Sequence, residues 1–253
     1  MYRCVRFQLR AKPLQETQLR RWAGQARWLW NRALHEQKTR YEAGQPYANY
    51  VAMAKWLTEW RNDPETAWLA QSPVHVQQQV LKHLDHAFQR FFANIKSGAR
   101  PGYPKFKRYG HEPGLRFPDA KQIQFDPGTQ RLKLPKLGWV RVRQSKAIPG
   151  NIANATLTRE GAKWYVSLQY QVADVAPAVG LAPTLALDLG VTNFYTTSEG
   201  VHQEPLHALK RQAARLRRYQ RAVARKQKGS NNRKKAVNRL ANLHRRIARQ
   251  RTD

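Results

Sequence analysis

The spacing of hydrophobic residues changes its period soon after the start of the chain. Residues 2–10 alternate between apolar and polar side chains, which predicts a short strand. From Leu19 to Tyr41 the apolar residues instead recur every three or four positions, which is the period of a helix. The pattern therefore predicts a strand followed by a long helix that ends before Gly44 and Pro46.

Two more helices are expected before residue 100. A short one is predicted around residues 50–60, where Asn62-Asp63-Pro64 bounds it. A longer amphipathic helix follows from Val76 to Ile95 and stops at Ser97-Gly98. Residues 11–97 are thus expected to form one helical block.

Beyond residue 100 the helical spacing is replaced by a loop and short alternating runs. RPGYPKFKRYG is a basic loop broken by proline and glycine, and short alternating runs such as RLKLPKLGWVRVR and KWYVSLQYQV follow it. We expect residues 1–10 and 100–172 to form an antiparallel β-module, and residues 173–183 to be a linker. The segment LALDLGVTNFYTTSEG then predicts two strands paired through a turn at residues 190–193.

The last part of the chain combines helical periodicity with a high charge. Residues 208–253 hold 17 Lys and Arg against one acid, Asp253. Apolar stripes at helical spacing lie on both sides of KGSNN, which offers a glycine to end one helix and Ser or Asn to cap the next. The segment therefore predicts a basic helical hairpin over residues 208–250. The stripe residues are Leu209, Ala213, Leu216 and Val223 in the first helix, and Val237, Leu240, Leu243 and Ile247 in the second.

The overall charge narrows the classes of partner. The 253 residues carry a formal net charge of +30 and a pI near 11.1, which suits a polyanion, and nucleic acid is the first candidate. No apolar run is long enough for a membrane helix and the start does not resemble a signal peptide, so we expect an intracellular protein without a membrane partner. Cys4 is the only cysteine, so we expect neither an internal disulfide nor zinc in this chain.

Two short stretches carry candidate chemistry. The loop residues Lys105, Phe106, Lys107 and Arg108 place cations for phosphate beside a ring for bases, although the rings could equally fill the edge of a core. Asp188 lies between two leucines of an expected buried strand, so its charge must be solvated, paired or bound to a cation. A single aspartate cannot hold the two Mg²⁺ ions of a phosphodiester-cleaving site.

Exposed cations of the predicted hairpin are further candidates. Because the segment would repel itself strongly, we interpret it as a phosphate-binding surface rather than a merely solvated face. The candidate residues are Arg217, Arg218, Arg233, Lys234, Lys235, Arg245 and Arg246.

The ordered motifs resemble one family. RRWAGQARWLWNRAL, QVLKHLDHAFQRFF, GYPKFK, KWYVSLQY, LALDLGVTNF and LHRRIARQRTD follow one another as in the TnpB (OrfB) proteins of IS200/IS605 insertion sequences. These proteins were long named transposases and are similar to RNA-guided DNA endonucleases, in which a guide RNA pairs with double-stranded target DNA.

The resemblance implies a fold and several roles. The fold would be α+β: a split WED-like β-module with a REC-like helical insertion at 11–97, then the first part of a RuvC, or RNase H-like, domain at 184–253. Asp188 would be its first Mg²⁺ ligand. Gln78 and Gln79 would face the duplex next to the target, where glutamine can pair with adenine edges. A bacterial, cytoplasmic and nucleoid-associated location is expected.

The chain also departs from the family pattern. After Asp188 the acids are Glu199, Glu204 and Asp253, and none has the context of a second catalytic carboxylate. We therefore expect a truncated TnpB-like protein that binds nucleic acid and does not cut DNA alone. Two alternatives remain open: an active nuclease or transposase completed by a separate C-terminal chain, and a stand-alone RNA-binding repressor.

Overall fold

The computed structural model describes residues 1–173 and 185–252, and the chain divides into two compact units, Met1–Asp174 and Val175–Asp253. The predicted linker, residues 173–183, lies outside the described part apart from residue 173.

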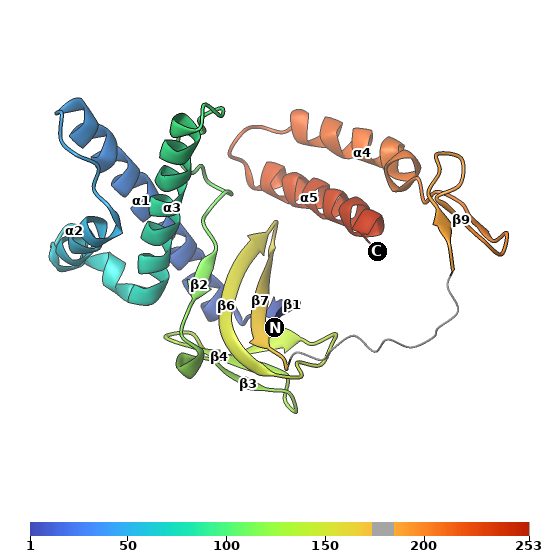
Figure 1. Cartoon of the computed structure of the whole chain (residues 1–253), viewed down its shortest axis with the longest axis horizontal. Coiled ribbons are helices and arrows are strands. Elements are labelled where there is room, and N and C mark those ends of the chain that lie inside the picture. The colour runs from blue at the N-terminus through green and yellow to red at the C-terminus, as the bar shows by residue number, and fades with distance from the viewer. Residues whose placement is uncertain (174–184, 253) are drawn as a thin grey trace. The chain divides into compact units, whose positions relative to one another are not determined.

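The first unit is built on one antiparallel sheet (Figure 1). Its strands follow the order β2-β6-β7-β1-β5-β4-β3, so the N-terminal strand β1 lies in the middle, between β7 and β5. Alternating burial of Val5, Phe7 and Leu9 shows that one face of β1 is covered and the other is open, as the sequence pattern predicts. The strands are β1 (Tyr2–Arg10), β2 (Leu115–Phe117), β3 (Gln124–Asp126), β4 (Arg131–Leu134), β5 (Gly138–Arg143), β6 (Asn151–Glu160) and β7 (Lys163–Gln171).

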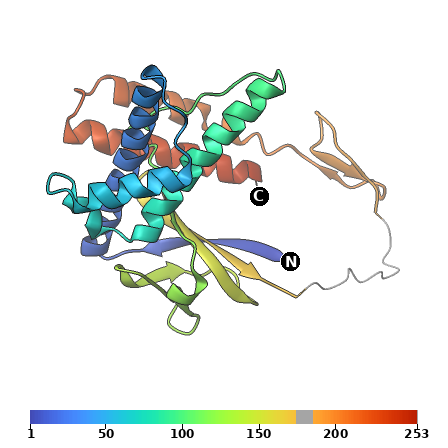
Figure 2. The same cartoon turned by 60° about the vertical axis from the view of Figure 1, so that its left-hand side comes forward.

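Helices occupy the chain between β1 and β2 and gather on one side of the sheet (Figure 1, Figure 2). The first begins at Pro13 rather than Leu19, because proline suits the first turn of a helix. The third ends where Gly98 takes a positive φ of 69°, as its sequence signal predicts. The helices are α1 (Pro13–Glu42), α2 (Tyr50–Asn62), η1 (Ala67–Gln71) and α3 (Val74–Lys96), and a short turn η2 (Ala120–Gln122) follows β2.

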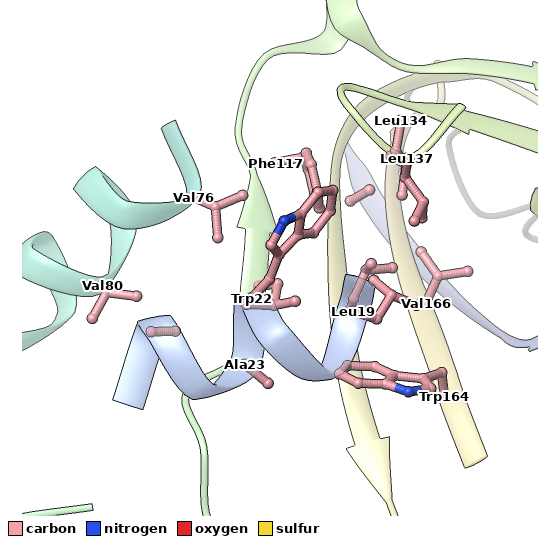
Figure 3. Packing of buried hydrophobic residues seen from close by; sticks show 14 of the residues in the cluster. Leu19, Trp22, Ala23, Val76, Val80, Phe117, Leu134, Leu137, Trp164 and Val166 are labelled. Carbon is pink, nitrogen blue, oxygen red and sulfur yellow. The ribbon is translucent and has the colours of Figure 1, made fainter. Parts of the chain in front are cut away.

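The core of this unit lies where α1 packs between the sheet and α3 (Figure 3). Leu19 of α1 lies beside Trp164 and Val166 of β7, while Trp22 lies between Val76 of α3 and Phe117 of β2. The rings of Trp22 and Phe117 are 6.4 Å apart. Burial of such large side chains is the main stabilising contribution here, at about 1.5–3 kcal/mol each.

The second unit contains a small sheet and the basic hairpin. Strands β8 (Leu187–Asp188), β9 (Tyr195–Thr197) and β10 (His202–Gln203) pair in the order β10-β9-β8, and all neighbours are antiparallel. Helices α4 (Ala208–Ala224) and α5 (Asn231–Thr252) confirm the predicted hairpin. The Ser230 hydroxyl accepts the Arg233 N–H at 3.2 Å, so the predicted serine cap of α5 is in use. The predicted glycine stop of α4 is wrong, because α4 is capped by Arg225 and Gly229, with a φ of 91°, lies in the turn before α5.

The seam of the hairpin differs in part from the expected stripes. Leu243 and Ile247 are buried against Leu216 and Tyr219, but Leu209 and Val237 are exposed. The buried stripe is narrower than the sequence spacing predicts. Two helices packed against each other bury only the one line of side chains on each helix that faces the other. Overall, helices and antiparallel strands lie in separate segments, which agrees with an α+β class.

Candidate nucleic-acid interface

Helix α1 holds the segment GYPKFKRY in an extended path. The Trp30 indole N–H donates a hydrogen bond to the Lys105 carbonyl at 3.0 Å. The Asn31 amide contacts the backbone of Lys107 twice: Nδ2 donates to its carbonyl at 3.0 Å, and Oδ1 accepts its N–H at 2.7 Å. Pro104 is buried as well, so the backbone is fixed, and the side chains of Lys105 and Arg108 are exposed.

The rings of this segment do not all fill a core edge. Phe106 is 45% exposed and Tyr109 is 76% exposed, while Tyr103 leans edge-on against Phe88 and Phe91 at 5.5 and 5.2 Å. The alternative that the rings serve packing alone therefore fits only Tyr103. Exposed rings on a fixed backbone are suited to stacking with unpaired bases.

Cations surround these rings. The Lys38 ammonium lies 5.2 Å from the centre of the Phe106 ring, and the Arg27 guanidinium lies 5.6 Å from that of Tyr109. Lys107 lies 4.6 Å from the Trp30 ring. Such contacts hold each charge beside an apolar surface, where it is less hydrated and more available to an anion.

A groove with a volume of about 1090 Å³ runs along the segment GYPKFKRY, and we name it the loop groove. None of the described residues that line it is acidic. The groove is lined by Lys38, Arg100, Pro101, Gly102, Tyr103, Pro104, Lys105, Phe106, Lys107, Arg108 and His111. The four predicted residues Lys105 to Arg108 are thus brought together, and Lys38 and Arg100 join them. Sequence reasoning missed Lys38, because only packing shows which turn of α1 meets the segment.

A more apolar hollow of about 400 Å³ adjoins the loop groove, and Tyr103 lines both. One of its walls is Tyr47, whose hydroxyl donates to the Asp85 carboxylate at 2.8 Å. Asp85 is buried and also accepts from Gln89 Nε2 at 2.7 Å. Burial, followed by this hydrogen bond and the charge of Asp85, raises the pKa of Tyr47 well above its ordinary value. The pair therefore keeps the wall of the hollow in one position.

The predicted glutamines lie on α3. Gln78 and Gln79 are half-buried, which leaves part of each amide accessible. Gln77 beside them is buried, and it is bound by Arg61 and donates to the Leu69 carbonyl at 2.8 Å. The sequence run QQQ is thus divided between one structural residue and two accessible ones.

The predicted cations of the hairpin are not equivalent. Arg217 and Arg218 on α4 are exposed, as are Lys234, Lys235 and Arg246 on α5. Arg233 instead is half-buried, and its Nη1 donates to the carbonyls of Val223 at 3.2 Å and Lys226 at 3.1 Å. It closes the end of α4, where carbonyls have no helical partner. Arg245 contacts Asn242 on its own helix at 3.3 Å.

Asp188 lies at the end of β8 and is exposed. The expectation of a buried strand is wrong here, since Leu187 is 58% and Leu189 is 75% exposed in the described structure. Among the described residues, this two-residue strand pairs with β9 alone, and Thr196 is the register partner of Asp188. On the far side of Thr196 lies His202 of β10, whose Nδ1 is 3.0 Å from the Thr196 hydroxyl.

Among residues 1–173 and 185–252, no three His, Cys, Asp or Glu side chains lie together as a metal site would require. The same residues contain no helix with the length and apolar character needed to span a bilayer. Asp188 taken with its described neighbours therefore does not fit a two-metal centre.

The described structure is that of a mixed α and β protein with a basic surface that carries exposed rings, and two family models match segments of the chain. A model described as "Probable transposase", OrfB_IS605, matches residues 167–253. A model described as "Helix-turn-helix domain", HTH_OrfB_IS605, matches residues 1–46. This second description does not fit the structure, in which residues 13–42 form the single helix α1 after the strand β1.

Two relatives extend the match across the chain. "Putative RNA-guided DNA endonuclease InsQ" of Escherichia coli (strain K12) is 39% identical over 248 residues, which cover 98% of this chain and 60% of that protein. "Putative RNA-guided DNA endonuclease" of Streptomyces pristinaespiralis is 32% identical over 255 residues, covering 98% and 61%. The chain belongs to the TnpB (OrfB) family of IS605-type insertion sequences, and it spans about 60% of the length of these relatives.

Proposed function

We propose that this chain forms the nucleic-acid-binding part of an RNA-guided DNA endonuclease, and that the loop groove holds an unpaired stretch of the guide RNA or of the target strand. The observation that carries this proposal is the fixed segment at residues 102–109. Trp30 and Asn31 hold its backbone, and Phe106 and Tyr109 remain exposed beside cations. Cations for phosphates and rings for bases together favour single strands over duplex.

The other parts of the chain receive roles within the same proposal. The sheet with its helical insertion would be the WED-like and REC-like region, and the second unit would be the first part of a RuvC-like domain. Gln78 and Gln79 would read the duplex next to the target, because glutamine can pair with adenine in the major groove. The exposed cations of α4 and α5 would follow nucleic-acid backbones. The names of the two relatives support RNA and DNA as partners.

Asp188 is proposed to be one Mg²⁺ ligand of the nuclease site. Two-metal cleavage of a phosphodiester needs several carboxylates from different elements, and the described neighbours of Asp188 do not provide them. We therefore propose that this chain binds guide RNA and DNA but does not cut DNA alone, and that a separate C-terminal chain supplies the further ligands.

Binding to a short fluorescein-labelled single-stranded RNA tests the role of the loop groove. Lys105→Ala should reduce the dependence of log affinity on log salt by about one, since one phosphate contact is lost. Phe106→Ala should weaken binding by about 1–3 kcal/mol through lost stacking. Lys163→Ala is the matched control, because Lys163 is an exposed lysine on β7 that does not line the groove. If Lys105→Ala and Lys163→Ala behave alike, the groove is not the binding site.

A cleavage assay tests the role of Asp188. The chain with guide RNA, target DNA and Mg²⁺ should give no cut product, and adding the C-terminal segment of a relative as a separate chain should restore cutting. Asp188→Asn should abolish the restored activity and leave RNA binding intact. Site-specific cutting by the chain alone would overturn the proposed division of the catalytic site.

A further inference from the structure

The open face of the sheet carries a second feature, a row of three arginines on three adjacent strands. Arg141 of β5 is paired in register with Arg10 of β1 on one side and with Arg131 of β4 on the other. Directly paired residues project from the same face of an antiparallel sheet. Their neighbours Leu9, Leu132 and Val142 are buried on the opposite face, so the three arginines share the exposed one.

Such a row costs free energy in the unbound protein. Like charges directly opposite each other on neighbouring strands destabilise a sheet, and here Arg141 has a like charge on both sides. In the described part of the chain, none of the three guanidinium groups has a hydrogen-bond or ion-pair partner. Asp126 lies opposite Arg131 on β3. Hydrogen bonds from Thr129 and Gly128 occupy this carboxylate and, more than the charge of Arg131, lower its pKa.

The row also borders a hollow with an aromatic wall. Arg10, Lys12, Gln15, Arg131, Trp139 and Arg141 line a cavity of about 520 Å³ that has no acidic lining residue among those described. Trp139 is 43% exposed, and its carbonyl accepts from the Gln15 amide at 2.9 Å, which fixes the backbone under the ring. The Lys133 ammonium lies 5.9 Å from the centre of the same ring.

We propose that the arginine row, Arg10, Arg141 and Arg131, binds consecutive phosphates of a single-stranded nucleic acid and that Trp139 stacks on one of its bases. Three strands place the outer arginines about 10 Å apart, more than one phosphate group can bridge, so the row fits a polyanion. The exposed indole adds the sequence-independent stacking typical of single-strand sites. This inference rests on the proposed nucleic-acid binding, but it assigns a surface separate from the loop groove, since the two share no lining residue.

The structure supplies a matched pair of variants for the test. Arg141 faces two arginines, whereas Arg143 lies on the same strand and the same face but is paired with Gln8. At low salt and without ligand, Arg141→Gln should raise the thermal midpoint because it relieves repulsion, and Arg143→Gln should not. With a short single-stranded RNA, Arg141→Gln should weaken binding about tenfold, the loss expected for a charge-assisted contact.

Two probes separate the possible anions. Inorganic phosphate at the same total phosphate concentration should raise the thermal midpoint of the wild-type chain far less than the RNA does. An equal effect of inorganic phosphate would overturn the assignment to nucleic acid. Because Phe106 of the loop groove is also proposed to stack on bases, this comparison is made in the Phe106→Ala protein. There, Trp139→Leu should reduce the preference for the RNA over an abasic strand of equal length, and Trp139→Phe should keep it. An unchanged preference after Trp139→Leu in that protein would overturn the stacking role.

The loop-groove variant Lys105→Ala distinguishes failure of this inference from failure of the proposed function. If Lys105→Ala weakens RNA binding while Arg141→Gln and Arg143→Gln have equal effects, the arginine row is wrong and nucleic-acid binding stands. If all three variants bind as the wild type does, both proposals fail.

Discussion

Asn31 and Lys107 are joined by two hydrogen bonds between one side-chain amide and one backbone residue. The Asn31 Nδ2 donates to the Lys107 carbonyl at 3.0 Å, and Oδ1 accepts the Lys107 N–H at 2.7 Å. This is the pairing that a neighbouring strand would otherwise offer to an extended segment. Helix α1 thus holds the backbone of Lys107 through a side-chain amide, while the side chains of Lys105 and Arg108 stay exposed.

Asn31→Asp tests this relationship with a minimal change of shape. The carboxylate keeps the acceptor for the Lys107 N–H but sets a second oxygen against the Lys107 carbonyl, so the segment should detach on one side. We expect RNA affinity to fall about tenfold while the fold is retained, as measured by fluorescence polarisation and circular dichroism. Asn62→Asp introduces the same charge at an exposed position at the end of α2 and should have a smaller effect. Equal losses for the two variants would show that charge alone is responsible.

Tyr47→Phe should destabilise the first unit by about 1–3 kcal/mol, because Asp85 is buried and would keep only the hydrogen bond from Gln89. Tyr41→Phe is the matched control, since Tyr41 lines the same hollow but is 84% exposed. Denaturant unfolding of both variants provides the comparison. A loss of stability in Tyr41→Phe as large as that in Tyr47→Phe would contradict this account of the Tyr47–Asp85 pair.

The raised pKa of Tyr47 predicts a dependence of stability on alkaline pH. Burial and the Asp85 carboxylate raise the pKa above the ordinary value of 10.0, so the folded protein keeps the phenol proton when the unfolded chain begins to lose it. The stabilising contribution is complete below pH 10 and is lost as pH rises further. Unfolding free energies measured across this range should fall more steeply for the wild type than for Tyr47→Phe. Parallel curves would exclude the effect.

His83 predicts the opposite behaviour on the acidic side. Partial desolvation of this largely exposed residue, followed by the charges of Arg116 and His86, lowers the pKa of His83 below its ordinary value of 6.5. The unfolded chain therefore takes up a proton first as pH falls, and the stability present above this value declines. His83→Gln should show a shallower loss of thermal midpoint between neutral and mildly acidic pH than the wild type. The idea fails if the two slopes agree.

Variants of Arg233 and Arg217 should distinguish a structural role from a binding role in the basic hairpin. Arg233→Ala removes donors to two carbonyls at the end of α4, so the hairpin should lose helical signal at a lower temperature. Arg217→Ala removes an exposed charge, so melting should be unchanged and the salt dependence of RNA binding should weaken by about one. Circular dichroism and salt titrations measure the two effects. Early melting of Arg217→Ala would contradict the assignment.

Local patterns accounted for much of the secondary structure. Alternation identified β1, helical spacing with glycine stops identified α1 and α3, and KGSNN placed the turn between α4 and α5. Lys105 to Arg108 were recognisable because cations and rings are interleaved within a few residues. In each case the signal lies within one or two turns of chain, where backbone geometry and capping depend on nearby residues.

Tertiary structure decided which residues face one another. The sequence could not show that β1 lies in the middle of the sheet or that Arg10 pairs with Arg141. The register between strands more than 100 residues apart depends on the packing of the whole sheet. The sequence also could not show that Arg233 closes a helix while Arg217 is exposed, or that Leu187 and Leu189 are exposed. The sequence determines the chemistry of each side chain. The packing of distant segments determines whether that side chain is paired, buried or exposed to solvent and ligands.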